Sequence, residues 1–383
     1  MKKFLYCIVL LAVSLAACGQ AATQAETSPT ETPAVNASPS PTALTATPQA
    51  TATYPSEGYS PSNLPTDFDP LTGLQVADPS LLDRRPMVIK VSNLPRYVRP
   101  QWGLSLADIV FEYYTEVGET RFAAVFLGHN ADMVGPIRSG RFIDSDIVRG
   151  YKAIFAFGYA YVAEMQQFQS SDFADRLVVE GPGSPLTRYD PNGYNYLVVH
   201  TADLSAYITK KGIPNGKQDL SGMSFNLTAP AGGQPVQHIF VRYSGEIYNR
   251  WDYNAGSKKY LRFSDTTEDY SAGQGEQYAQ LTDRLTNQPI AFDNLVVLYA
   301  SYDLYSPEIY DIQFSGSGDG YAFRDGQAYQ VKWHRNDTDV VSLTTPDGTP
   351  FAFKPGDTWF EVMGVSSTLE QNDAGWRFTH FMP

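Results

Sequence analysis

Three arginines, two of which lie on either side of a Ser-Gly pair, form the pattern that most clearly indicates a binding site in this sequence. Arg121 lies in an apolar run, and Arg138, Ser139 and Arg141 follow Gly135-Pro136. Arg138 and Arg141 are three residues apart, so their side chains share one face if a helix begins near Ser139. Guanidinium groups and the N–H groups at a helix start are how proteins hold phosphate or carboxylate. The pattern predicts an anion-binding site formed by these three arginines and Ser139.

Two carboxylate side chains that follow the arginines in sequence could provide a metal site. Asp144 and Asp146 could hold a divalent cation that bridges phosphate oxygens, because such cations prefer oxygen ligands. No other cofactor is expected, and this cation belongs only to a phosphotransferase. The same arginines could instead form ion pairs with Glu112 and Glu116 and lock a loop, which would make them structural.

The two glutamates offer a third possibility. Glu112 and Glu116 are an even number of residues apart, so on a strand their side chains share one face. Two carboxylates that flank an open cleft can hydrolyse a glycosidic bond. The five histidines include no i,i+4 pair, and the sequence has neither a Gly-x-Ser-x-Gly elbow nor a phosphate-loop motif. Zinc hydrolases, serine hydrolases and phosphate-loop enzymes are therefore not indicated.

The charge balance and the cysteine count exclude some classes of binding partner and of site. The chain has 28 Lys and Arg against 41 Asp and Glu, a net charge of −13, and nucleic acids are bound by basic rather than acidic surfaces. No nucleic-acid partner is expected, and any anionic ligand must be held by a local arginine cluster. Cys7 and Cys18 are the two cysteines, so we expect no disulfide and no thiolate site in the rest of the chain.

The N-terminus is typical of an exported protein with a lipid anchor. Lys2 and Lys3 precede an uncharged run of 14 residues, 4–17, and Cys18 follows. At about 1.5 Å per residue this run covers roughly 21 Å, less than the roughly 30 Å of a bilayer core. Its end, Leu-Ala-Ala-Cys, resembles the lipobox of bacterial lipoproteins. The resemblance implies that residues 1–17 are a signal peptide and that Cys18 carries lipid, which anchors the protein on the extracytoplasmic side of the cell membrane.

Residues 18–66 have the composition of a disordered tether. They are rich in Thr, Pro, Ala and Ser and contain no aromatic residue before Tyr54. Such a segment buries too little apolar surface to offset the conformational entropy that folding would cost. We expect it to hold a folded body away from the membrane.

The remaining sequence predicts an α+β body in two parts. Residues 67–230 alternate strand and helix patterns, which predicts an N-terminal α/β domain. Residues 231–383 alternate β-branched and aromatic runs with turn residues, which predicts a predominantly β C-terminal domain. The expected strands are 86–92, 121–127, 237–243, 248–253, 259–263, 290–302, 309–315 and 327–334, and the expected helices are 141–151, 159–168 and 201–211.

Several ordered motifs of this body resemble those of the YerB-like bacterial lipoproteins, a family whose two halves are both domains of unknown function. The resemblance covers nearly all of residues 69–365. It implies a cell-envelope lipoprotein and brings no settled activity. The matching segments are residues 69–74, 99–110, 118–122, 135–141, 324–333 and 354–359.

A second resemblance bears on the phosphotransferase alternative. Arg121, the arginine loop 138–141 and the small-residue run 156–159 follow one another in an order similar to that of the LytR-CpsA-Psr envelope phosphotransferases. The Arg-Asp dipeptide of that family is absent from the loop 138–141 of this chain. The resemblance therefore extends to the order of the elements and not to the catalytic residues.

Three functions remain open on this basis. We expect first a non-catalytic envelope module that binds an anionic cell-wall component or a partner protein, because no pattern commits to a nucleophile or a general base. The alternatives are a metal-dependent phosphotransferase acting on a lipid-linked phosphate or pyrophosphate, and a wall-glycan hydrolase. The directions of the Arg121 and Arg138 side chains distinguish them best.

Overall fold

Two β-sheets carry most of the fold, and the larger one combines strands from both halves of the sequence. The computed structural model describes residues 54–190, 193, 196–307 and 309–381. The strands of the larger sheet are β1 (Met87–Ser92), β2 (Ile109–Tyr114), β3 (Thr120–Phe126), β4 (Ile154–Ala156), β5 (Leu177–Val178), β9 (Gln234–Pro235), β15 (Asn294–Ser306), β16 (Ile309–Gln313), β17 (Gly316–Arg324), β18 (Gln327–Arg335), β19 (Ser342–Thr344) and β21 (Thr358–Gly364).

The smaller sheet comes entirely from the second half of the sequence. Its strands are β10 (His238–Arg242), β11 (Tyr248–Asn254), β12 (Lys259–Asp265), β13 (Tyr278–Gln280), β14 (Ala291–Phe292), β22 (Thr368–Asn372) and β23 (Gly375–Thr379). Two short pairs complete the strands: β6 (Thr187–Arg188) with β7 (Leu197–Val198), and β8 (Ser224–Phe225) with β20 (Ala352–Phe353). The helices are α1 (Phe142–Gly150), α2 (Val162–Gln169) and α3 (Thr201–Lys210), and short 3-10 turns lie at Pro79–Asp83, Arg96–Val98, Leu104–Leu106 and Ala174–Arg176.

Strand β21 joins the two halves within the larger sheet. The strand order is β19-β18-β17-β15-β21-β2-β3-β1-β4-β5, with β16 on β15 and β9 on β18 outside this path. β21 is parallel to β15 on one side and to β2 on the other, where Ile109 pairs with Thr358 and Tyr113 with Val362. All its residues are buried, as expected for a central strand that packs side chains on both faces.

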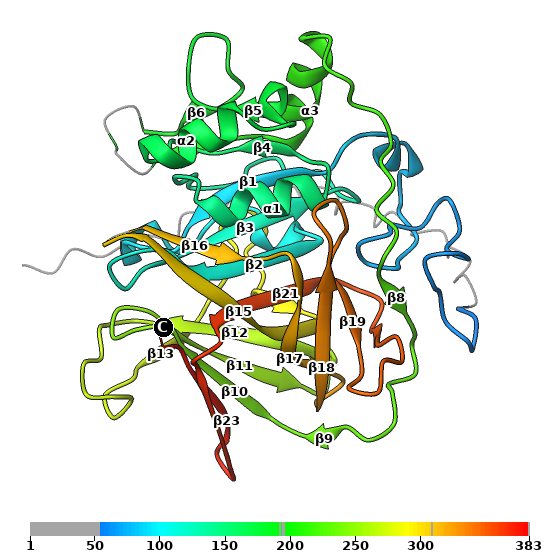
Figure 1. Cartoon of the computed structure of the whole chain (residues 1–383), viewed down its shortest axis with the longest axis vertical. Coiled ribbons are helices and arrows are strands. Elements are labelled where there is room, and N and C mark those ends of the chain that lie inside the picture. Colours follow the sequence, from blue (N-terminus) through cyan, green and yellow to red (C-terminus); the bar gives the residue numbers. More distant parts are fainter. Residues whose placement is uncertain (1–53, 191–192, 194–195, 308, 382–383) are drawn as a thin grey trace, which may run out of the picture. The chain divides into compact units, whose positions relative to one another are not determined.

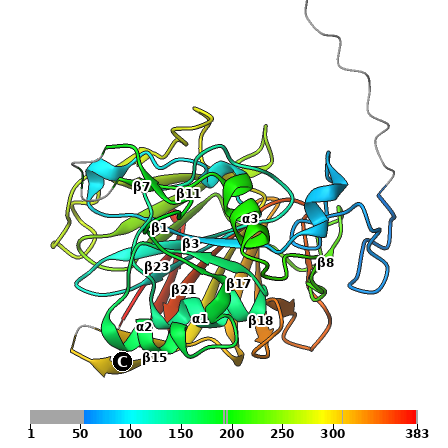
Figure 2. The same ribbon diagram turned by 90° about the horizontal axis from the view of Figure 1, so that it is seen from above.

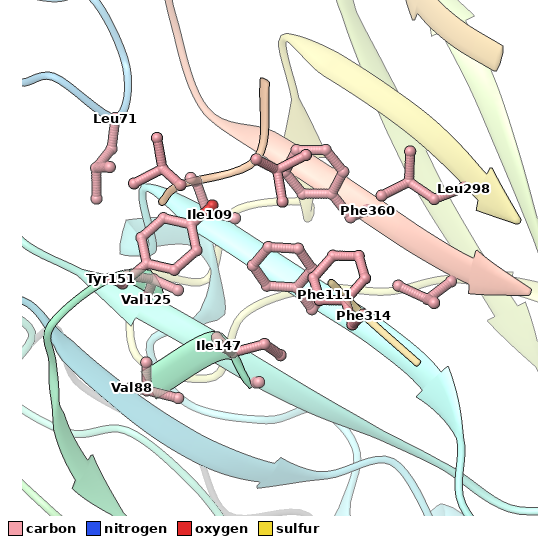
Figure 3. Close-up of a cluster of buried hydrophobic side chains, with 14 of the residues drawn as sticks. Leu71, Val88, Ile109, Phe111, Val125, Ile147, Tyr151, Leu298, Phe314 and Phe360 are labelled. Carbon is pink, nitrogen blue, oxygen red and sulfur yellow. The ribbon is translucent and has the colours of Figure 1, made fainter. Parts of the chain in front are cut away.

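The larger sheet lies between two apolar layers. Successive residues of a strand face opposite sides, so Val88 of β1 packs in the layer that includes Ile147 of α1, and Ile89 packs in the layer that includes Trp251 of the smaller sheet. In Figure 2, helices α1 and α2 lie on one side of strands β1 and β3, and strand β11 lies on the other side. In the first layer Phe111 of β2 stacks on Phe360 of β21, with ring centroids 4.8 Å apart (Figure 3).

The structure agrees with the predicted α/β and β halves only in their broad content of helices and strands. Strands predominate, and in the described part of the chain all three α-helices precede residue 211 (Figure 1). The α/β prediction for the first half is met only in part, because β3 is antiparallel to both β1 and β2, and only β4 is parallel to β1. By their contacts the described residues lie in one compact unit, 52–383, which we call the body.

The predicted end of the tether at residue 66 is wrong, because the body already begins at Tyr54. The rings of Tyr54 and Tyr59 meet edge to face with centroids 4.5 Å apart, and Tyr59 meets Phe68 in the same way at 5.1 Å. Tyr59 also forms a β-bridge with Phe225. Three aromatic side chains thus supply the apolar contacts that the Thr/Pro/Ala/Ser composition lacks.

The anchor predicted at the N-terminus lies outside the described residues. These exclude residues 1–53 and therefore the predicted signal peptide, Cys18 and most of the predicted tether. Across the described ranges, every helix is too short or too polar to cross a bilayer.

Candidate functional site

The loop before α1 carries three of the predicted site residues, Arg138, Ser139 and Arg141, and is bonded to the larger sheet. Arg138 donates its backbone N–H to the Lys90 carbonyl of β1 at 2.9 Å, and its own carbonyl accepts from Gly158 N–H at 2.8 Å. Gly140 N–H donates to the Tyr159 carbonyl at 2.7 Å. The loop is thereby fixed between β1 and the segment after β4, and Arg138 and Tyr159 are carried by two segments that are hydrogen-bonded to each other.

The helix does not begin at Ser139, which was the condition for Arg138 and Arg141 to share a helical face. α1 starts at Phe142, and Arg141 is its N-cap with extended backbone, φ −138° and ψ 163°. Arg138 and Arg141 therefore do not share a helical face, and the reason given for their proximity was wrong. They nevertheless line the same pocket.

One pocket contains all four residues predicted to bind an anion. Its volume is about 430 Å³, within the range of about 300–1,000 Å³ that is usual for ligand sites. The residues that line it come from the turn before β3, from β3, from the loop before α1 and from the segment before α2. They are Glu116, Val117, Glu119, Arg121, Arg138, Ser139, Arg141, Tyr159, Ala160 and Tyr161.

Arg141 is the structural arginine of this pocket. Its Nε lies 2.7 Å from Glu116 Oε2, its Nη2 bonds Glu116 Oε1, and its Nη1 donates to the Gly140 carbonyl at 2.7 Å. Burial alone would raise the pKa of Glu116, but the hydrogen bonds from Arg141 and the charge of Arg121 outweigh it, and the pKa is lowered. Glu116 is therefore a fixed anion, and every nitrogen of the Arg141 fork is occupied.

Arg121 has side-chain N–H donors that no described residue accepts. Only 4% of its surface is exposed, and its Nη2 donates to Glu116 Oε1 at 2.6 Å. Its Nε and Nη1 are buried, and neither finds an acceptor among the described residues. Burial, followed by the charge of Arg141, lowers the pKa of Arg121. A buried guanidinium with unpaired N–H groups is costly, so this site gains stability from any anion that enters it.

The remaining charges of the pocket are Arg138 and Glu119. Arg138 and Ser139 are half-buried, and the charge of Arg138 adds to the positive field around Arg121. Glu119 Oε2 lies 3.6 Å from Arg121 Nη2, and its side chain is 29% exposed. Three arginines against two glutamates leave a local positive charge in a chain whose net charge is −13.

Asp144 and Asp146 do not form the predicted cation site. Asp144 caps α1 by accepting the Arg141 N–H at 2.6 Å, and its other oxygen pairs with Lys90 Nζ at 3.2 Å. Asp146 instead turns to Arg335, with Oδ1 3.3 Å from Nη2. Two residues apart on a helix, the side chains point in different directions. Within the described ranges no three metal-ligating side chains converge.

Glu112 and Glu116 do not form a hydrolytic pair either. β2 ends at Tyr114, so the strand spacing that would place both side chains on one face does not extend to Glu116. Glu112 is fully buried and pairs with Arg262 of β12 at 2.7 Å, whereas Glu116 pairs with the arginines of the pocket. Each carboxylate is neutralised in a different environment.

Lys90, which pairs with Asp144 of α1, was not predicted to lie near the site. It is fully buried in β1, with Nζ bonded to the Tyr113 hydroxyl and to Asp144. Burial lowers its pKa to about 7; Asp144 opposes the shift, and the charges of Arg121 and Arg141 add to it. The sequence feature that could have revealed it is a lysine in the middle of an apolar strand, because a charged side chain is rarely buried without a partner.

Glu164 of α2 was also missed. Its side chain is fully buried, its Oε2 accepts the Tyr161 N–H at 3.0 Å, and the same oxygen lies 3.6 Å from Arg141 Nη1. Burial raises its pKa to about 7; Arg141 lowers it, and the negative charges of Asp144 and Glu116 raise it further. The spacing from Tyr161, three residues, is that of a helix-capping glutamate.

A second cavity has a different character. It measures about 210 Å³ and shares no residue with the arginine pocket. Residues 61–70 and 217–223 form most of its walls, and the Nη atoms of its Arg84 are bound to Asn130 and to backbone carbonyls. The arginine pocket is therefore the better candidate for a charged ligand.

Comparison with known proteins places this chain in a family. Residues 71–213 match the N-terminal domain, and residues 239–360 the C-terminal domain, of the "Protein of unknown function (DUF3048)" family. The chain is 28% identical over 314 residues to "Putative lipoprotein YerB" of Bacillus subtilis (strain 168), covering 77% of this chain and 85% of that protein. The crystal structure of YerB protein from Bacillus subtilis is similar, with a TM-score of 0.64, 25% identity, and coverage of 77% of this chain and 96% of that one. This protein therefore belongs to the YerB-like, DUF3048 family.

Proposed function

We propose that this protein is a lipoprotein, anchored through Cys18 on the extracytoplasmic side of the membrane, that binds an anionic component of the cell envelope in the arginine pocket without catalysing a reaction. Its relationship to a protein named as a lipoprotein supports the anchor, as does the Leu-Ala-Ala-Cys segment. The observation that carries the binding proposal is Arg121, whose buried Nε and Nη1 lack acceptors among the described residues.

A phosphate or a carboxylate is the group that fits these donors. Arg121 has two nitrogens without an acceptor among the described residues, and Arg121 and Arg138 line the same pocket. A charge-assisted hydrogen bond contributes about 1.5–3 kcal/mol. Arg141 and Glu116 hold each other in place, so the pocket keeps its shape before the ligand arrives.

The carboxylates of the pocket favour binding over catalysis. A general base works best when its pKa is close to the pH at which it operates. The pKa of Glu116 is lowered, and both its oxygens accept from arginines. The phosphotransferase alternative required Asp144 and Asp146 to converge, and the hydrolase alternative required a carboxylate pair across a cleft. The positions of these side chains support neither.

Arg121→Gln is expected to weaken the binding of inorganic pyrophosphate by about 10- to 100-fold, because it removes the two unpaired donors from the pocket. The body should stay folded, since Arg141 continues to neutralise Glu116. Arg121→Lys should give an intermediate affinity, because it keeps the charge and loses the fork. Isothermal titration of the body and of each variant measures the effect.

The matched control is Arg250→Gln, which removes the same charge from a half-buried arginine that pairs with Asp252 on β11, outside the pocket. It should leave pyrophosphate affinity nearly unchanged. Equal losses in Arg121→Gln and Arg250→Gln would mean that only net charge matters and would contradict the pocket.

Anion binding is expected to strengthen as the pH falls from 8 to 6. Glu164 and Lys90 both have a pKa of about 7, and protonation makes the first neutral and the second positive. Both changes add positive charge near the arginines. Sulfate is the suitable probe, since its charge is constant over this range. Titrations at both pH values should show tighter binding at pH 6, with a smaller difference in Glu164→Gln; a pH-independent affinity would contradict this coupling.

A further inference from the structure

The walls of the arginine pocket show what else its ligand carries besides charge. Tyr159, Tyr161 and Val117 line the pocket and are among the exposed large apolar side chains of the body, at 64%, 41% and 73% exposure. A cluster of exposed apolar groups next to a polar site marks a surface that contacts a partner or ligand. Here that cluster is aromatic and borders the buried arginines.

The Tyr161 ring packs on a cation, and the Tyr159 ring is attached to a fixed backbone. Tyr161 lies against Arg141, whose guanidinium carbon is 4.9 Å from the ring centroid, so one face of this ring is occupied by a cation. Tyr159 is mostly exposed, while its carbonyl accepts a hydrogen bond from Gly140 N–H. Ala160 between them is buried and pins the segment to the core.

The pocket is too large for a small inorganic anion alone. Its volume of about 430 Å³ is more than ten times the roughly 30 Å³ that a water molecule occupies in the liquid. A phosphate bound at Arg121 and Arg138 would leave most of this space, along the tyrosines, for a further group. That group must offer a flat apolar face to the rings and hydroxyl groups to the solvent at the rim.

A sugar ring has this combination of surfaces. We infer that the ligand is a sugar that carries the anionic group, with the phosphate or carboxylate at Arg121 and Arg138 and the ring packed on Tyr159 and Tyr161. This inference rests on the proposed function and specifies its ligand class. Phosphate and carboxylate are both within the chemistry of the arginines; the tyrosines add the requirement for a carbohydrate.

The test compares three probes on the body: inorganic phosphate, glycerol 1-phosphate and glucose 1-phosphate. Covering the apolar face of a sugar by a tyrosine ring is expected to make glucose 1-phosphate bind about tenfold more tightly than glycerol 1-phosphate. Tyr159→Ala should remove most of this advantage, and Tyr161→Ala part of it. Because Tyr159 is mostly exposed, its replacement should not disturb the fold.

Tyr270→Ala is the matched control, because Tyr270 is 74% exposed and does not line the pocket. It should keep the full preference for the sugar phosphate. Equal affinities for glycerol 1-phosphate and glucose 1-phosphate, or a preference that survives Tyr159→Ala, would overturn the sugar inference and leave the proposed function standing. Absence of binding of all three probes would overturn both.

Discussion

Expressed separately, residues 52–230 and residues 231–383 are each expected to remain unfolded or to aggregate, although the family models divide the chain close to this point. The first fragment would expose the edge of β2, which pairs with β21 along Ile109 to Tyr113. The second would expose the corresponding edge of β21, a strand buried along its whole length. Long apolar edges of this kind promote aggregation.

The side chains that cross this junction make the dependence stronger. Phe111 stacks on Phe360, and Phe122 meets Trp359 edge to face with centroids 5.0 Å apart. Far-UV circular dichroism and urea titration of each fragment, beside the intact body, measure the effect. A soluble 52–230 fragment with a cooperative unfolding transition would contradict the shared sheet.

Arg262→Met is expected to destabilise the body by about 3–5 kcal/mol, the typical cost of removing one partner of a buried ion pair. Arg262 is fully buried, with Nη2 2.7 Å from Glu112 Oε2 and Nη1 3.2 Å from Glu361 Oε1. It thus holds β2 of the first half and β21 of the second. The substitution would leave two buried carboxyl groups without a cation.

The cost should also depend on pH. Burial, and then the charge of Glu112, raise the pKa of Glu361 to about 8 even with Arg262 present. A carboxyl group whose pKa is raised in the folded state favours folding at low pH and loses that contribution as the pH rises through the raised value. Without Arg262 more charge must be neutralised by protonation, so the loss should be larger at pH 8 than at pH 5.

Urea unfolding at both pH values measures the change in the free energy of unfolding. Arg188→Met is the control, because Arg188 forms an exposed pair with Glu180 and exposed pairs contribute at most about 1 kcal/mol. If Arg262→Met costs no more than Arg188→Met at either pH, the account of the junction is wrong.

Local patterns predicted many of the elements. The three expected helices correspond to α1, α2 and α3, and the hairpin expected at 248–253 and 259–263 is β11 and β12. The arginine cluster was also visible, because an arginine in an apolar strand and two more after Gly135-Pro136 need partners. These features depend on neighbours in sequence, which a pattern can show.

Contacts between distant residues were not predictable in the same way. Asp144 finds Lys90 54 positions away, and Asp146 finds Arg335 189 positions away, so their adjacency in sequence gave a false metal site. The pairing of β2 with β21 joins residues near 110 and 360, and no local pattern reports it. Tyr54, Tyr59 and Phe68 carried a further local signal that was overlooked, since their aromatic rings mark where the predicted tether becomes body.

The central claim is that Arg121 and Arg138 receive an anion, and the most direct measurement observes their side-chain N–H groups. In a ¹⁵N-arginine-labelled body, the Nε–H resonances of both can be assigned from spectra of Arg121→Gln and Arg138→Gln. Titration with pyrophosphate at constant ionic strength should shift these two resonances saturably, with the same dissociation constant as calorimetry, while the Arg250 resonance stays in place. If the Arg121 and Arg138 resonances do not move, or if all arginines shift together in proportion to concentration, the pocket does not bind anions and its arginines serve only the fold.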